Sequence, residues 1–178
     1  MKAHWKYLQY VLCHKWYVFV ACCKLGIPLA GLVHDMSKFS PSEWFPYVDK
    51  FYGGKWPEQH YGDMRNQLDY AYTQGWVDLR FDEAWNHHQK RNPHHHQYWV
   101  LREDSGLVKV LDMPMRYRKE MLADWRGAGM AINGKDDTRN WYLKNRDRML
   151  LHPDTREWIE SKLGIRLNVN GVEVRLDE

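Results

Sequence analysis

The chain has 178 residues and a formal net charge of +3, and hydrophobic residues make up 44% of it. This length fits one domain with a buried core, and the balance of apolar and charged residues argues against both a disordered chain and a membrane bundle. The small charge gives no reason to expect nucleic acid as a partner, and three cysteines do not make a disulfide framework. We therefore expect a cytoplasmic protein with reduced thiols and no membrane contact.

The first third of the chain is predicted to consist of helices joined by short turns. Apolar residues recur at helical spacing from residue 4 to residue 25, and Gly26 and Pro28 are typical of a helix end. Ser40, Pro41 and Glu43 have the spacing of a helix N-terminus. The pattern therefore predicts these segments in chain order: helices over 4–25, 29–35 and 41–51, then a mostly loop segment over 52–66.

The rest of the chain is predicted to be helical up to a short β-hairpin. Pro93 interrupts a helical pattern, and residues 165–176 alternate between apolar and polar side chains around Asn170-Gly171, as a tight hairpin does. The predicted helices cover 81–91, 94–101, 115–130, 139–145 and 153–163. We therefore predict an all-α domain over residues 1–163 and a C-terminal β-hairpin over residues 164–178.

The sharpest chemical feature is the dipeptide His34-Asp35, which follows the apolar pair Leu32-Val33. Both side chains are common metal ligands, and burying them side by side is costly unless each has a partner. A divalent cation would supply that partner. The alternative is a helix-end Asp beside a solvated His, and the dipeptide alone does not decide between the two.

Single His and Asp residues elsewhere add to this pair. His14 lies near the apolar stripe of the first predicted helix, where a lone His is usually a satisfied core residue. Asp124 lies among apolar residues on the predicted 115–130 helix, and Asp112 competes with it as the acidic candidate in this region. Lys38 follows His34-Asp35 by about one helical turn, so it either reaches a phosphate oxygen or is a solvated surface side chain.

A cluster of histidines lies between Trp85 and Trp99. The five residues are His87, His88, His94, His95 and His96. A solvated, adventitious tract is one interpretation, but the flanking Trp residues favour a tract held against a core. Successive side chains on a helix differ by about 100°, so the five cannot all reach one ion. We expect His87, and His94 or His95, near a metal, with His96 outside and Asn92 holding the second nitrogen of one ligand.

The order His, His-Asp, His cluster, Asp resembles that of the HD superfamily of metal-dependent phosphohydrolases. The string His34-Asp-Met-Ser-Lys38 is similar to that of the HD-GYP branch, although the Gly-Tyr-Pro part is absent. The resemblance implies an HD-domain helical bundle with one or two divalent ions. It implies these ligands: His14, His34, Asp35 and Asp124 for the first ion, and Asp35 with His87 or His88 and His94 or His95 for a second.

A closer resemblance is to a family of bacterial and phage proteins with no settled activity. It extends over most of residues 7–160. The shared strings are similar to His34-Asp-Met-Ser-Lys-Phe-Ser40, His87-x4-Asn92-x-His94-His95, Glu120-Met-x-x-Asp124-Trp125 and Leu151-His-Pro153. This resemblance bears on fold and site more than on substrate.

Taken together, the residues and the resemblance lead us to expect hydrolysis of a phosphoester or phosphoanhydride, most naturally in a nucleotide. Imidazole and carboxylate donors suit Mn, Fe, Co, Ni or Zn ions, which activate water. Asp35, Lys38 and Asp124 are the expected catalytic residues, and the expected partner is a small phosphorylated molecule. Two alternatives stay open: an HD-type diiron oxygenase similar to myo-inositol oxygenase, and a non-catalytic binding module stabilised by metal. The sequence also leaves open whether the chain forms a homo-oligomer.

Overall fold

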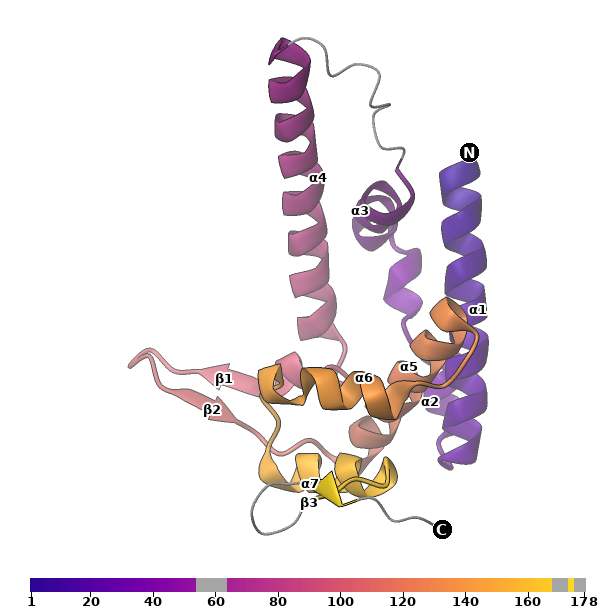
Figure 1. Ribbon diagram of the computed structural model, residues 1–178, viewed down its shortest axis with the longest axis vertical. Coiled ribbons are helices and arrows are strands. Elements are labelled where there is room, and N and C mark those ends of the chain that lie inside the picture. The colour runs from indigo at the N-terminus through magenta and orange to yellow at the C-terminus, as the bar shows by residue number, and fades with distance from the viewer. Residues whose placement is uncertain (54–63, 168–172, 175–178) are drawn as a thin grey trace. The chain divides into compact units, whose positions relative to one another are not determined.

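The computed structural model describes residues 1–53, 64–167 and 173–174 (Figure 1). These residues form seven α-helices and two small antiparallel sheets of two strands each. The prediction of a mostly helical fold with a small β component is therefore confirmed. Among the described residues, no helix combines the length and the apolar character that crossing a bilayer requires.

The chain divides into two compact units. The first comprises residues 1–13 and 35–91, and the second comprises residues 14–34 and 92–178. Helix α1, Lys2–Lys24, contributes its first half to one unit and its second half to the other. The predicted division after residue 163 is a different one and stays a prediction.

The first unit is built from helices α3, Pro41–Tyr52, and α4, Met64–Arg91, together with the start of α1. Helix α3 packs against α4, and a 3-10 turn, Met36–Phe39, precedes α3 (Figure 1). The buried residues that join the three helices are Tyr7, Val11, Tyr47, Val48 and Ala84. Helix α4 is much longer than the predicted helix over 81–91. The prediction was too short because the polar sequence before residue 81 shows little helical periodicity. Most of the predicted 52–66 loop lies outside the described residues.

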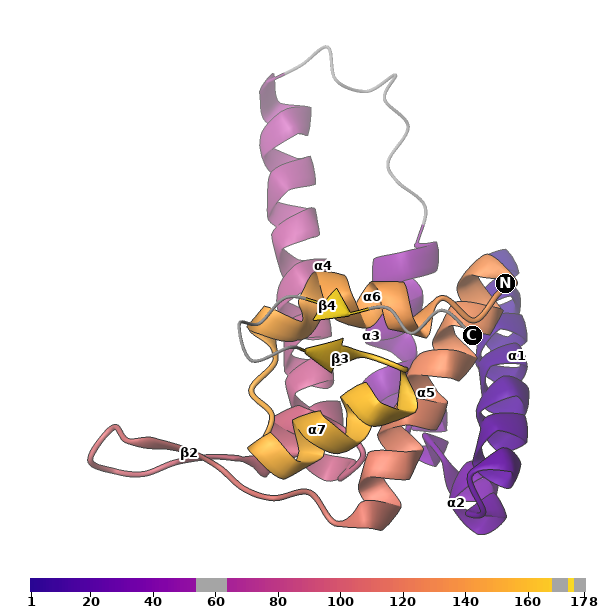
Figure 2. The same cartoon turned by 60° about the horizontal axis from the view of Figure 1, so that its bottom comes forward.

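The second unit contains the remaining helices (Figure 2). They are α2, Pro28–Val33; α5, Met115–Asn133; α6, Thr138–Asn145; and α7, Pro153–Lys162, with short 3-10 turns at His96–Trp99 and Arg146–Arg148. Helices α5, α6 and α7 share one apolar core, which includes Leu122, Tyr142 and Ile159. The second half of α1 packs on α5 through Val18, Cys22 and Ala123. Helices α2, α5, α6 and α7 all lie close to their predicted ranges.

The predicted helix over 94–101 is wrong. After the 3-10 turn, strand β1, Val100–Arg102, pairs antiparallel with β2, Val108–Val110, so that Val100 lies opposite Val110. Trp99 Nε1 donates to the Pro93 carbonyl at 2.7 Å, and Gly106 has a φ of +85° in the connecting turn. The valines favour a strand, and this hairpin extends away from the helices of its unit (Figures 1 and 2).

The predicted C-terminal hairpin is confirmed in its pairing. Strand β3, Arg166–Leu167, pairs antiparallel with β4, Glu173–Val174, and Arg166 lies opposite Val174. The predicted turn residues Asn170 and Gly171 lie outside the described residues. Alternating side chains therefore identified the pairing without any information on tertiary contacts.

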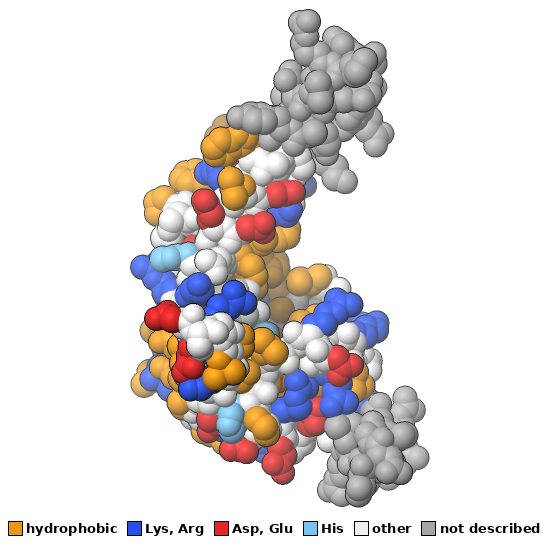
Figure 3. Space-filling model, turned by 90° about the vertical axis from the view of Figure 1, so that its left-hand side faces the viewer, with side chains coloured by type: hydrophobic (Ala, Val, Ile, Leu, Met, Phe, Trp, Pro, Cys, Tyr) orange, Lys and Arg blue, Asp and Glu red, His pale blue; other side chains and the backbone are white. Residues whose placement is uncertain are grey.

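Charged and apolar side chains are mixed on the face that Figure 3 shows. Basic and acidic side chains alternate with hydrophobic ones over both α4 and the elements around the β1–β2 hairpin (Figure 3). Neither sign of charge is gathered into one stripe on the described part of this face. The expectation that nucleic acid is not a partner stays a prediction.

Two glycines allow helices of the second unit to approach closely. A Cβ added at Gly127 of α5 would lie 2.4 Å from Val18 Cγ2 and 2.9 Å from the Val18 backbone nitrogen on α1. A Cβ added at Gly31 of α2 would lie 2.8 Å from Phe19 Cα on α1. The backbones of α1, α2 and α5 are therefore closer together than any larger residue permits.

We predict that Gly127→Ala destabilises the protein by about 1–3 kcal/mol, because α5 must move away from α1 to admit the methyl group. Urea unfolding followed by circular dichroism measures this change. Gly75→Ala on α4 is the matched control, since no atom lies within 4 Å of a Cβ added there. The control should be neutral or stabilising by up to about 1 kcal/mol. Equal stability of Gly127→Ala and wild type would contradict the close approach.

Candidate metal centre

The dipeptide His34-Asp35 lies at a sharp change in backbone direction. Helix α2 ends at Val33, His34 is extended, and Asp35 has a φ of 51° and a ψ of 32°. Asp35 is the one non-glycine residue in the described chain with a positive φ. Asp tolerates this left-handed conformation better than most residues do. The kink explains how two consecutive polar side chains are both buried, with exposed fractions of 1% and 2%.

In the second unit, two imidazoles converge on one carboxylate oxygen. His14 Nε2 of α1 lies 3.1 Å from Asp124 Oδ1 of α5, and His34 Nε2 lies 3.4 Å from the same oxygen. His14 and His34 are fully buried, and the Asp124 side chain is 14% exposed. The close approach of α1, α2 and α5 at the two glycines therefore brings three predicted metal-ligating residues together.

Glu120 orients two of the histidines and was missed by the sequence analysis. Its Oε1 lies 3.2 Å from His34 Nδ1 and 3.4 Å from His94 Nδ1. A carboxylate can only accept, so Nδ1 of His34 is the donor. In a neutral ring, Nε2 then carries the lone pair, and it faces Asp124. Glu120 lies one helical turn before Asp124 on the same face of α5, and this spacing is the signal that could have identified it.

The charges of these carboxylates follow from their partners. Burial raises the pKa of Glu120, but hydrogen bonds from His34 and His94 have the larger, opposite effect, so the pKa is lowered to about 2. Burial also raises the pKa of Asp124, but His14 and His34 hold it well below its usual range. Both side chains are therefore anionic at neutral pH.

The donor set fits a transition-metal ion. The ligand atoms of His14, His34 and Asp124 all lie within 4.8 Å of one another, and so do those of His34, His94 and Glu120. Two imidazole nitrogens and one carboxylate oxygen are a common catalytic set for zinc and for non-haem iron. With Nδ1 donating to Glu120, His34 lowers the pKa of Asp124 only when Nε2 also carries a proton, and a metal ion could take the place of that proton between the two atoms.

The first unit contains a second arrangement of the same kind. His88 Nδ1 lies 2.7 Å from Glu43 Oε2, and His88 Nε2 lies 3.4 Å from Asp35 Oδ1. Ser37 Oγ donates to Glu43 at 3.1 Å, and Lys38 Nζ pairs with Asp35 Oδ2 at 2.6 Å. Burial lowers the pKa of His88, but its hydrogen bonds to Asp35 and Glu43 raise it more, so the net shift is upward.

Glu43 therefore has a different role from the one its position in the chain suggested. Helix α3 begins after Ser40 as predicted, but the Ser40 side chain makes no capping hydrogen bond and lies 3.0 Å from Ser42 Oγ. Glu43 is completely buried and binds His88 instead. In both units a buried Glu holds His Nδ1 while Nε2 faces an Asp, the arrangement that orients many metal-ligating histidines.

The remaining predicted residues are distributed as follows. His87 is exposed and belongs to none of the ligand clusters found among the described residues, whereas its neighbour His88 is fully buried. The His95 ring lies 4.3 Å from the His94 ring. His96 lies apart from both, next to the Leu150 backbone and Arg156, where burial and Arg156 lower its pKa.

Of the two competing aspartates, only Asp124 lies with the histidines of the predicted first site. Asp112 accepts hydrogen bonds from Arg118 and from Thr155 Oγ1 and is half exposed. Its neighbour His152 lies 3.6 Å away, but the Arg118 guanidinium already neutralises the carboxylate. The sequence left the choice between these two aspartates open. Asp124 is the one that lies beside His14 and His34, whereas Asp112 forms an ion pair with Arg118.

Comparison with known proteins identifies the family. Residues 3–165 match the model of a family described as "Family of unknown function (DUF5662)". The chain belongs to this family. Searches of curated proteins and of solved structures found no match. The family description assigns no activity.

We predict that Glu120→Gln lowers the stability of the metal-free protein by about 2–3 kcal/mol at pH 7, because the native carboxylate is stabilised relative to the unfolded one. A carboxylate whose pKa is lowered on folding stabilises the folded protein at pH values above its unfolded pKa, near 4.5. This stabilisation is lost as the pH falls toward the folded pKa of about 2. The gap between variant and wild type should therefore narrow below pH 4.5. Urea unfolding across pH measures it, with the exposed Glu157→Gln as control. A gap that is constant with pH would contradict the argument.

Proposed function

We propose that this protein is a metal-dependent phosphohydrolase that acts on a nucleotide or a related phosphoester or phosphoanhydride. The observation that carries the proposal is the convergence of His14 Nε2 and His34 Nε2 on one oxygen of Asp124. Glu120 supports it, because it holds the opposite nitrogen of His34. Two buried imidazoles and a carboxylate whose ligand atoms lie within 4.8 Å of one another, with one ring held from behind by Glu120, fit the requirements of a metal site.

The donor types favour a catalytic site over a structural one. Structural zinc sites are usually closed by four protein ligands that include Cys, whereas catalytic sites keep a position open for water or substrate. The cluster in the second unit offers two imidazoles and one carboxylate, and none of the three cysteines belongs to the described ligand clusters. A divalent ion held by this set would lower the pKa of a coordinated water from ~15.7 to about 7 and polarise a phosphoryl oxygen.

Asp35 and Lys38 are the remaining proposed catalytic residues. Asp35 follows His34 directly in the chain, and the sequence predicts it to be a ligand as well. Its two oxygens face His88 and Lys38, which fix the orientation of the carboxylate and balance its charge. Lys38 is 9% exposed, and its buried ammonium is a fixed point charge of the kind that attracts a phosphate.

The first test is metal content and hydrolysis in Asp124→Asn. This change keeps the shape of the side chain but removes its charge, so we expect metal per chain to fall and turnover to drop by about 100-fold or more. Elemental analysis of untagged protein and a metal-supplemented panel of nucleotides measure the two effects. Asp147→Asn is the control, because the Asp147 side chain is 95% exposed.

The outcome of this test also separates the alternatives. Full metal content in Asp124→Asn would contradict the site. Metal that raises the melting temperature, without turnover of any nucleotide, would replace the proposal with a metal-stabilised binding module. Two irons per chain with a mixed-valence EPR signal, again without hydrolysis, would replace it with an oxygenase.

A second prediction concerns Asp35. Because Asn tolerates the left-handed backbone nearly as well as Asp does, Asp35→Asn should keep the kink while removing the charge. We expect turnover to fall by about 100-fold or more with the helical circular dichroism spectrum unchanged. Asp49→Asn, at a half-exposed residue paired with Arg80, should leave turnover unchanged. Wild-type turnover in Asp35→Asn would remove Asp35 from the site.

A further inference from the structure

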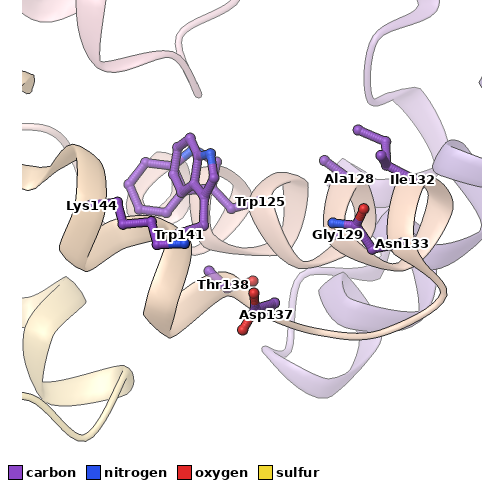
Figure 4. Close-up of a pocket in the computed structure, with 9 residues that line it drawn as sticks. All are labelled: Trp125, Ala128, Gly129, Ile132, Asn133, Asp137, Thr138, Trp141 and Lys144. Carbon is purple, nitrogen blue, oxygen red and sulfur yellow. The ribbon is translucent and has the colours of Figure 1, made fainter.

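A pocket of about 240 Å³ lies between helices α5 and α6 in the second unit (Figure 4). The side chains of Trp125 and Trp141 lie together at one end, and those of Ala128 and Ile132 lie at the other. Asp137 and Thr138 lie between the ends, on the side that α6 provides (Figure 4). The proposed phosphohydrolase site uses none of these residues.

The aromatic end of the pocket is anchored in the core. The Trp125 ring stacks on the buried Tyr142 with centroids 5.9 Å apart and an interplanar angle of 30°. It also contacts Trp141, with centroids 5.2 Å apart, and the Trp141 side chain remains 43% exposed. A fixed indole therefore supports a second indole that offers part of its surface to a ligand.

The floor of the pocket is made of small residues. Ala128 and Gly129 line it, and a Cβ added at Gly129 would lie 3.1 Å from the Lys135 carbonyl oxygen. The absence of a side chain at Gly129 lets the loop before α6 approach α5. This approach places Asp137, whose Oδ1 accepts from Asn140 at 2.6 Å, at the pocket wall.

The size and lining select the class of ligand. Pockets for drug-sized molecules span about 300–1,000 Å³, so this pocket suits a single ring system. Indole faces stack on nucleobases of every kind, and the Asp137 carboxylate and the Asn133 amide can bond the polar edge of a base. The Thr138 hydroxyl is buried and already donates to Asp136 Oδ1 at 2.5 Å. Lys144 is exposed at the aromatic end and adds a positive charge.

The position of the pocket connects it with the metal centre. Trp125 follows Asp124 in the chain, and Ala128 lies one turn beyond Asp124 on the same side of α5. One turn of helix advances 5.4 Å, so the first pocket residues lie within about one turn of Asp124 along the axis of α5. We propose that this pocket binds the base of the nucleotide whose phosphate is hydrolysed, an inference that rests on the proposed function.

The experiment measures base binding without phosphate and without metal. Adenosine, guanosine, cytidine and uridine are titrated into the full chain in the presence of a chelator, with ribose as the control ligand, and binding is followed by saturation-transfer NMR and calorimetry. We expect at least one nucleoside to bind, ribose not to bind, and Trp141→Ala to weaken nucleoside binding about tenfold. Trp141→Phe should keep most of the affinity, and Trp16→Ala, at an exposed Trp on α1, should keep all of it.

A second variant removes the space instead of the ring. Ala128→Leu fills the pocket and leaves both indoles in place, so it should also weaken nucleoside binding about tenfold. Ala131→Leu is the matched control, because Ala131 is a partly exposed residue of α5 that does not line the pocket. Nucleoside affinity unchanged in both Trp141→Ala and Ala128→Leu, or no binding of any nucleoside to wild type, would overturn the inference.

These outcomes are distinct from failure of the proposed function. Pocket-dependent nucleoside binding without turnover of any phosphorylated compound would support the base site and overturn its link to hydrolysis. Turnover of nucleotides with an unchanged KM in Trp141→Ala would support the phosphohydrolase and overturn the base site. Turnover with a KM raised about tenfold and a nearly unchanged kcat supports both.

Discussion

The burial of Asp124 between two imidazoles is the interaction on which the second unit depends. A buried carboxylate is costly unless charged or hydrogen-bonding partners compensate it, and His14 and His34 lie within 3.4 Å of one of its oxygens. The residues involved come from α1, the end of α2 and α5, so no local segment can satisfy the carboxylate by itself. Glycines at the contacts of α1 with α2 and α5 allow the backbones to approach far enough for these partners to meet.

The first unit meets the same constraint with a different balance of charge. Asp35 and Glu43 are compensated by Lys38 and by His88, whose pKa is raised. Tyr7 lies nearby, and burial raises the pKa of its hydroxyl further above neutral pH. Each unit thus holds a histidine whose Nδ1 is held by a Glu and whose Nε2 faces an Asp, and the peptide bond between His34 and Asp35 joins the two sets in the chain.

Most helices could be predicted from the sequence because their signals are local. Apolar spacing and the prolines at positions 28, 41 and 153 identified helix ends within a few residues of those observed. The segment after Pro93 was predicted incorrectly, because its strand pairs with residues 108–110, and that partner is not visible in a local pattern. The start of α4 was missed because its local signal is weak: the sequence there is polar and lacks a clear apolar stripe.

The sequence by itself determined which residues are chemically suited to hold a metal, because His and Asp side chains are recognisable wherever they occur. Tertiary structure decided which of them meet: Asp124 lies with the histidines while Asp112 pairs with Arg118, and His88 is buried while His87 is exposed. It also assigned Glu43 and Glu120 to histidines, although each reads locally as an ordinary helix residue. The physical reason is that a side chain's direction and its compensating charges are set by packing between segments far apart in the chain.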